Sequence, residues 1–163
     1  ILRYELETCG CDGQYHNGLE HILNIFLGNT NQPTQPAVWV SGFDGSGKSH
    51  LVKMLRALWV NTRFDDGATA RGIAHLPEDI KAHLTELDNQ GKRHGGGLHA
   101  ASGTLGSMGY EAVRPSFLSI VFKSLGLPER IQVARFALYL TGQGLLEEMK
   151  AVVNSFRGSN GCD

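Results

Sequence analysis

The sequence predicts an α/β fold, a three-layer sandwich in which helices cover a parallel sheet. The first observation is an apolar, β-rich segment, residues 37–41, followed by a glycine-rich loop and an amphipathic helix. The second is another candidate strand, residues 98–105, whose small side chains would let it pack beside the first. Strands that alternate with helices are typical of parallel sheets, and such sheets bind ligands at the loop between a strand and the next helix.

The loop after the first predicted strand matches a phosphate-binding motif. Residues 42–49 read Gly-Phe-Asp-Gly-Ser-Gly-Lys-Ser, which fits the P-loop pattern G-x-x-x-x-G-K-[ST]. The glycines let the backbone turn tightly and direct successive N–H groups toward one point. Lys48 can reach the β- and γ-phosphates of a nucleotide, and the Ser49 hydroxyl can complete the shell of a Mg²⁺ ion.

We therefore predict a site for ATP and Mg²⁺ at this loop. Lys48 is the expected catalytic residue and Ser49 is the expected metal ligand. The positive N-terminal end of the following helix adds to the attraction for phosphate. The predicted nucleotide-binding residues are Gly42, Phe43, Asp44, Gly45, Ser46, Gly47, Lys48, Ser49 and His50.

The other predicted elements are helices, marked by apolar residues at helical spacing and by end signals. Pro77 begins one of them with Gly91 as its C-cap, and residues 62–75 are expected to form a loop with a turn at Asp65–Gly67. The predicted helices are residues 12–27, 49–61, 77–91, 115–125, 129–140 and 145–156. We expect residues 1–36 to form an N-terminal helix and connector, and residues 37–163 a partial nucleotide-binding domain.

Composition narrows the class of protein. The 163 residues are one domain's worth of chain, and a net charge of -1 gives no electrostatic preference for nucleic acid or an anionic membrane. No apolar run approaches the roughly 20 residues of a membrane span, and the first residues lack the apolar core of a signal peptide. We expect a cytoplasmic protein with a nucleotide as its partner and no membrane. Nucleic-acid binding has no support in the sequence, and self-association stays open.

The chain carries three cysteines, Cys9, Cys11 and Cys162. A single C-x-C with a distant third cysteine is not a structural zinc pattern, and an odd number does not fit a disulfide framework. Reduced thiols are therefore expected. A metal site that joins Cys9 and Cys11 to His16 and His21 is the alternative.

A hydrolytic partner for the loop is missing from the sequence. A working P-loop NTPase usually adds a Walker B element, an apolar strand that ends in a carboxylate and helps to hold Mg²⁺. The apolar runs 119–122 and 136–140 are each followed by a residue without a carboxylate. The acidic pairs Asp65-Asp66 and Glu147-Glu148 lie in a predicted loop and a predicted helix. The sequence therefore supports nucleotide binding more strongly than hydrolysis.

Other charged segments are weaker candidates. Residues 88–91 match the D-x-x-G of GTPases, but they lie at a predicted helix end and no N-K-x-D follows. Residues 92–94 form a basic loop that could touch phosphate, although a solvated loop is the default interpretation. Arg130 and Arg135 could serve as arginine fingers, but surface charge on a helix is the commoner explanation.

Segments spread over most of the chain also carry a family resemblance. These segments are residues 11–15, 35–43, 45–55, 66–72, 98–106, 120–124 and 126–129. Together they resemble the P-loop protein family of bacterial BREX phage-resistance systems (BrxC/PglY). The resemblance implies an AAA+-like ATP-binding region of a longer antiphage ATPase that acts with other BREX components. It also implies that the Walker B element lies beyond residue 163.

The resemblance is incomplete. The chain departs from the family in length, in the extra glycine of residues 95–97 and around residues 107–116, and the likeness fades after Arg135. Two other functions stay open. A small-molecule kinase of the shikimate or gluconate kinase type shares the loop pattern but places it almost at the N-terminus. A catalytically inert, truncated nucleotide-binding module is the other.

Overall fold

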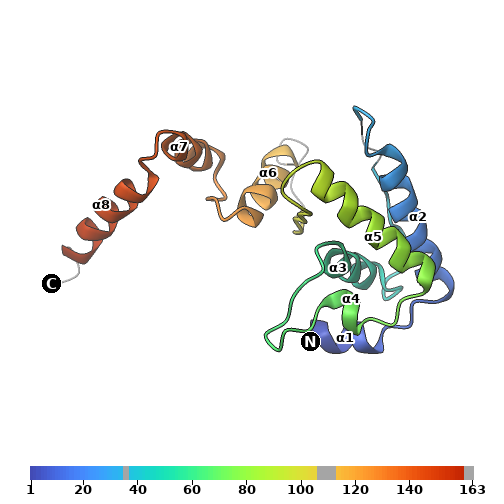
Figure 1. The fold of residues 1–163 in the computed structure, drawn as a ribbon. Coiled ribbons are helices and arrows are strands. Elements are labelled where there is room, and N and C mark those ends of the chain that lie inside the picture. The colour runs from blue at the N-terminus through green and yellow to red at the C-terminus, as the bar shows by residue number, and fades with distance from the viewer. Residues whose placement is uncertain (35–36, 106–112, 160–163) are drawn as a thin grey trace. The chain divides into compact units, whose positions relative to one another are not determined.

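The structure, a computed structural model, describes residues 1–34, 37–105 and 113–159, and it is helical. Pro36 and Cys162 lie outside the described residues. The helices, labelled in Figure 1, are α1 (Leu2–Thr8), α2 (Gly13–Asn29), α3 (Lys48–Trp59), α4 (Ala70–Ile73), α5 (Glu78–Arg93), α6 (Val113–Ser124), α7 (Ile131–Gly142) and α8 (Leu146–Ser159). The chain divides into two compact units, residues 1–100 (unit 1) and residues 101–163 (unit 2).

The predicted α/β sandwich with a parallel sheet is wrong, and so is the P-loop NTPase, AAA+-like fold. The described residues form no sheet, and their one recorded β pairing is an isolated antiparallel bridge between Arg63 and Thr69. Residues 37–41 have no strand partner among the described residues, and Trp39 is 90% exposed. A strand forms only through hydrogen bonds to a neighbouring strand. The apolar, β-rich character of residues 37–41 is therefore not sufficient to make them a strand.

The second predicted strand is also wrong. Residues 98–105 are irregular throughout. Gly103 lies close to α6 of the same unit, since a Cβ built on Gly103 would be 2.5 Å from the Ile120 Cγ1. The lack of a side chain at Gly103 permits close packing against a helix in place of the predicted strand.

Most helix predictions are confirmed, with shifted ends. The predicted cap at Gly91 is wrong, because α5 continues to Arg93 with His94 as its C-cap. The turn at Asp65–Gly67 is present, and Gly67 adopts a φ of 83°. The predicted loop 62–75 contains the short helix α4, which Thr69 caps by accepting a hydrogen bond from the Gly72 N–H. Helix α1 was not predicted.

The core of unit 1 lies between α2, α3 and α5, and α1 and α4 add to it. Helices α2 and α5 pack side by side over the longest stretch (Figure 1). The Phe26 ring meets the Trp59 ring edge-on, with centroids 4.6 Å apart. The fully buried side chains of this core are Leu6, Leu19, Leu23, Met54, Ile80, Leu84 and Leu87. These positions recur at helical spacing, so each helix buries one apolar stripe.

Unit 2 buries much less. The buried side chains of its described part are Ala134, Ala137 and Leu140, all on α7. Large apolar side chains of α7 and α8 remain exposed, among them Tyr139 and Phe156. None of the described helices is both long and apolar enough to cross a bilayer.

One arginine joins three helices of unit 1. From α4, the Arg71 guanidinium donates to the carbonyls of Leu58 at 2.6 Å and Trp59 at 2.9 Å, at the end of α3. It also donates to the Leu84 carbonyl at 3.1 Å and to Asp88 Oδ2 at 2.6 Å, both on α5. The Arg71 side chain is only 14% exposed. Carbonyls of the last helical turn lack α-helical partners, and the guanidinium supplies donors to two of them, of which Leu58 also accepts from the Asn61 N–H at 3.3 Å.

We expect Arg71→Ala to lower the free energy of unfolding by about 3 kcal/mol, because it removes several charge-assisted hydrogen bonds from a partly buried site. Urea denaturation followed by circular dichroism measures the change. Arg3→Ala is the matched control: Arg3 pairs with Glu7 and Asp66 at 44% exposure. The control should cost no more than about 1 kcal/mol. Equal effects of the two variants would contradict this role of Arg71.

Candidate phosphate-binding loop

The loop that precedes α3 depends on its glycines. Gly45 and Gly47 adopt φ values of 75° and 83°, in the left-handed region that other side chains disfavour. A Cβ built on Gly42 would lie 2.7 Å from the Ser46 Oγ, so a side chain there would need the Ser46 hydroxyl to turn away. The loop therefore curls back on itself in a way that most other residues at Gly45 and Gly47 would disfavour.

The Lys48 ammonium lies inside this curl. Its Nζ donates to the Gly42 carbonyl at 2.9 Å, to the Phe43 carbonyl at 2.5 Å and to the Ser46 Oγ at 3.3 Å. The acceptors are neutral groups. No carboxylate balances the charge of this ammonium in these contacts, so an incoming phosphate would add the attraction of an opposite charge to the hydrogen bond.

The N-terminal end of α3 adds further donors. Gly47 is the N-cap and has no side chain to cap the helix. The N–H groups of the first helical turn, at Lys48, Ser49 and His50, have no acceptors within the helix. The helix dipole makes this end attractive to anions. The exposed Ser49 hydroxyl is a hard oxygen donor of the kind that suits Mg²⁺.

The remaining predicted residues take other positions. Phe43 offers its carbonyl to Lys48, while its side chain is 90% exposed. Asp44 Oδ1 accepts from the Gly45 N–H at 3.0 Å, which supports the turn. The His50 ring lies 5.9 Å from the Tyr15 ring, measured between centroids, so His50 faces α2. The structure thus gathers the loop carbonyls, Ser46 and Lys48, and places His50 against a neighbouring helix.

A cavity of about 680 Å³ adjoins the loop within unit 1. Residues 38–43 and the start of α3 line one part, and α2 lines the other with Tyr15, Gly18 and His21. Its volume falls in the range of roughly 300–1,000 Å³ typical of small-molecule sites. The wall formed by α2 was not predicted, because these residues precede the loop and carry no phosphate motif.

Ion pairs engage three of the acidic candidates, Asp66, Asp88 and Glu147. Asp66 pairs with Arg3. Glu147 pairs with the Lys150 Nζ, one turn further along α8, at 2.7 Å. Asp88 holds Arg71, so its D-x-x-G match reflects packing. The apolar runs 119–122 and 136–140 lie in α6 and α7. Within the described residues, none of these segments provides a strand-borne carboxylate.

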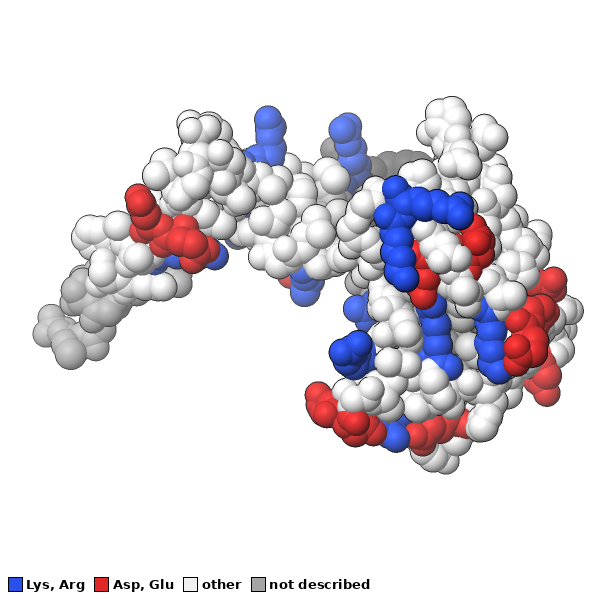
Figure 2. Space-filling view, viewed as in Figure 1, with Lys and Arg blue, Asp and Glu red and all other residues white. Residues whose placement is uncertain are grey.

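The basic candidates are exposed. Lys92 and Arg93 end α5, and Arg93 approaches Glu86 at 3.9 Å. Arg135 lies on α7 with an exposed side chain. On the face of unit 1 that Figure 2 shows, Lys and Arg are interspersed with Asp and Glu. Nucleic-acid binding gains no support from this face.

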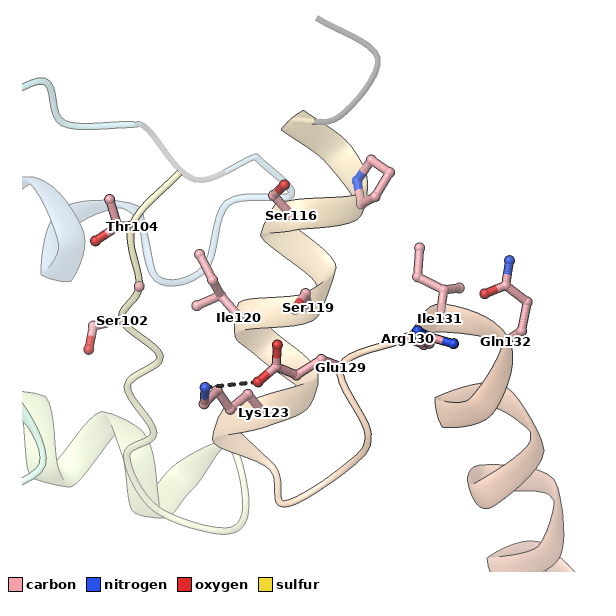
Figure 3. A pocket seen from close by; sticks show the side chains of 12 residues that line it. Ser102, Thr104, Ser116, Ser119, Ile120, Lys123, Glu129, Arg130, Ile131 and Gln132 are labelled. Carbon is pink, nitrogen blue, oxygen red and sulfur yellow. Dashed lines mark ion pairs between the residues drawn. The ribbon is translucent and has the colours of Figure 1, made fainter. Parts of the chain in front are cut away.

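A second cavity, of about 650 Å³, lies within unit 2 (Figure 3). Lys123 and Glu129 form an ion pair of 2.8 Å in its lining. The hydrogen bond between them raises the pKa of Lys123 and lowers the pKa of Glu129. Because these two opposite charges neutralise each other, the pair gives the cavity no strong preference for an anionic or a cationic ligand.

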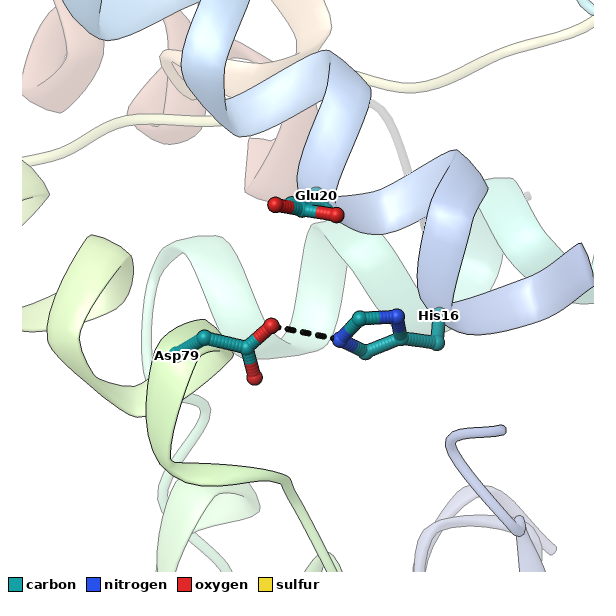
Figure 4. A group of neighbouring side chains, drawn as sticks. All are labelled: His16, Glu20 and Asp79. Carbon is teal, nitrogen blue, oxygen red and sulfur yellow. Dashed lines mark hydrogen bonds and ion pairs between the residues drawn. The ribbon is translucent and has the colours of Figure 1, made fainter. Parts of the chain in front are cut away.

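A cluster of titratable side chains lies between α2 and α5, and sequence reasoning missed it. His16 Nε2 lies 2.6 Å from Asp79 Oδ2, and Glu20 is close to both (Figure 4). The hydrogen bond to Asp79 raises the pKa of His16. Burial alone would raise the pKa of Asp79, but hydrogen bonds from His16 and from the Ile80 N–H outweigh it and lower that pKa. The four-residue spacing on α2 could have identified His16 and Glu20 as neighbours, but it could not identify Asp79, which is distant in sequence.

The predicted alternative metal site is not assembled. Cys9 and Cys11 are free thiols, and neither belongs to the one group of metal-ligating side chains found among the described residues. Burial raises the pKa of both thiols. They are therefore poor metal ligands at neutral pH.

No family model and no solved structure matches this chain. The resemblance to the BREX proteins stays a prediction.

We expect Gly47→Ala to lower the free energy of unfolding by about 1–2 kcal/mol, because alanine must then adopt the left-handed conformation at the N-cap of α3. Thermal or urea denaturation measures the loss. Gly28→Ala is the control, since Gly28 lies in α2 with nothing within 4 Å of a built Cβ. That variant should be neutral or gain roughly 0.5–1 kcal/mol. A loss in Gly28→Ala equal to that in Gly47→Ala would contradict the expectation.

The His16–Asp79 pair should contribute to stability over a defined pH range. Because the pKa of His16 is raised in the folded state, its contribution to stability is complete below pH 6.5 and is lost as the pH rises through the pKa of His16 in the folded protein. Because the pKa of Asp79 is lowered in the folded state, its contribution to stability is complete above pH 3.8 and is lost as the pH falls through the pKa of Asp79 in the folded protein. An NMR titration should show a lower His16 pKa in Asp79→Asn than in the wild type. An unchanged His16 pKa would show that the pair does not form.

Proposed function

We propose that this chain binds the phosphates of a nucleoside triphosphate, ATP with Mg²⁺, at the loop Gly42–Ser49. The observation that carries the proposal is the position of Lys48. Its ammonium lies within the curl of the loop, 2.9 Å from the Gly42 carbonyl and 2.5 Å from the Phe43 carbonyl, beside the uncapped N-terminus of α3. Positive charge, free N–H groups and an adjoining cavity favour an anionic ligand.

The proposal concerns a loop in a helical unit and does not depend on an α/β sandwich. The residues that define it, from Gly42 to Ser49, are local in sequence, and so are their hydrogen bonds. Lys48 would turn from the loop carbonyls to the phosphates. Ser49 would be the protein's ligand to Mg²⁺, which neutralises phosphate charge when bound.

Binding without turnover by this chain alone is the form of the proposal that we favour. Hydrolysis also needs a carboxylate that helps to hold the metal, and the acidic candidates Asp66, Asp88 and Glu147 are paired with basic side chains. The described residues include no strand-borne carboxylate, so a catalytic role for Lys48 would need an assembly that supplies one. The BREX antiphage ATPase is the assembly that the sequence resemblance indicates, and a cytoplasmic location goes with it.

Isothermal titration of ATP, with and without Mg²⁺, tests the proposal on the full chain. We expect Lys48→Met to weaken binding by about 10- to 100-fold, which corresponds to a charge-assisted hydrogen bond of roughly 1.5–3 kcal/mol. Lys92→Met is the matched control, because it removes the same charge from an exposed position in unit 1. Its affinity for ATP should equal that of the wild type.

Ser49→Ala separates the metal from the phosphate contacts. This variant should lose most of the gain in affinity that Mg²⁺ gives to the wild type, while it keeps binding to metal-free ATP. Circular dichroism confirms that each variant is folded. Unchanged affinity in Lys48→Met, or equal losses in Lys48→Met and Lys92→Met, would refute the proposed site.

A further inference from the structure

The cluster between α2 and α5 has the composition and spacing of a metal site. We propose that His16, Glu20 and Asp79 bind a divalent transition-metal ion of the Zn²⁺ class. One imidazole nitrogen and two carboxylate oxygens lie within 4.8 Å of one another, and the side chains converge between the two helices (Figure 4). None of the three residues lines the cavity at the phosphate-binding loop, so the inference is independent of the proposed function.

The helices fix where the three ligands begin. His16 and Glu20 are four residues apart on α2, and such residues lie on one face of a helix, one turn apart. Asp79 lies in the first turn of α5. The backbones beneath the cluster are held by buried neighbours, Leu19 on α2 and Ile80 on α5. Ligands on packed helices are better ordered than ligands on loops.

The distances suit a small ion after a modest change of side-chain rotamer. A tetrahedral ion with bonds of about 2.0–2.2 Å needs donor atoms about 3.3 Å apart. The His16 Nε2 and the Asp79 Oδ2 are 2.6 Å apart, so this distance would have to increase slightly. The three ligand atoms lie within 4.8 Å of one another, so the longer distances among them would have to decrease. The His16 and Asp79 side chains are 22% and 42% exposed, so they can turn without disturbing the core.

Charge balance also favours a cation. Two carboxylates meet one imidazole, which is neutral when it binds a metal. Glu20 takes part in none of the ion pairs recorded for the described residues. A divalent ion would neutralise both carboxylates. Asp79 is also followed one turn later on α5 by His83, whose Nδ1 is buried without a hydrogen-bond partner in the described part of the chain.

The donor set selects the kind of metal. An imidazole with carboxylates suits Zn²⁺ and its neighbours in the first transition row, whereas Mg²⁺ and Ca²⁺ prefer oxygen ligands alone. Three protein ligands leave a fourth position of a tetrahedral ion for water. Such an ion would join α2 to α5, the two helices that pack over the longest stretch of unit 1.

Zn²⁺ titration of the full chain, without nucleotide and near neutral pH, tests the site. We expect at least a tenfold loss of Zn²⁺ affinity in Glu20→Gln and in His16→Ala. Glu20→Gln keeps the shape of the side chain and disturbs no recorded ion pair, so its loss would not reflect unfolding. His21→Ala is the control, since His21 is an exposed histidine of α2 outside the cluster, and its affinity should not change.

A Co²⁺ absorption spectrum identifies the ligands. Nitrogen and oxygen ligation gives d–d bands without a thiolate-to-cobalt charge-transfer band, and this is the expected spectrum. Absence of Zn²⁺ binding in the wild type would overturn the inference. So would wild-type affinity in Glu20→Gln, or a charge-transfer band that shows binding by the cysteines.

Discussion

The hydrogen bonds of Arg71 tie the end of α3 to α5, and the geometry of unit 1 depends on this connection. Its guanidinium takes up the carbonyls of Leu58 and Trp59, where α3 ends, and reaches Leu84 and Asp88 on α5. The same helix α3 begins at Lys48, within the phosphate-binding loop. Because a helix is rigid over three turns, a contact that orients one end also orients the other. Packing against α2 then places the loop beside the helix that completes the cavity.

Local signals in the sequence predicted the helices and the loop, and failed for the arrangement of the chain. Apolar spacing and capping residues are properties of a few neighbouring residues, so α2, α3 and α5 were found with shifted ends. A strand is different, because it exists only through a partner elsewhere in the chain. Residues 37–41 have the composition of a buried strand, yet Trp39 is 90% exposed and no segment that the structure describes pairs with these residues. Composition could not show that absence.

The same distinction applies to the sites. The curl at Gly45 and Gly47 and the position of Lys48 are decided within one octapeptide, and the motif identifies them. The contacts of Arg71 with Asp88 and of His16 with Asp79 join residues far apart in the chain, and no spacing rule finds them. The cavity wall formed by α2 belongs to this second group. What the sequence could not supply is the packing of α2 against α3 and the loop, which creates the wall, and against α5, which creates the His16 cluster.

The binding of an anion where Lys48 and the first turn of α3 converge can be observed at single residues. A ¹H–¹⁵N NMR titration of the full chain with ATP and Mg²⁺ tests it most directly, because it reports on each backbone N–H. We expect the largest shifts on the amides of Gly45, Gly47, Lys48 and Ser49, and no change at the exposed end of α5 at Lys92. Shifts that are absent from the loop, or that centre on other helices, would contradict this expectation.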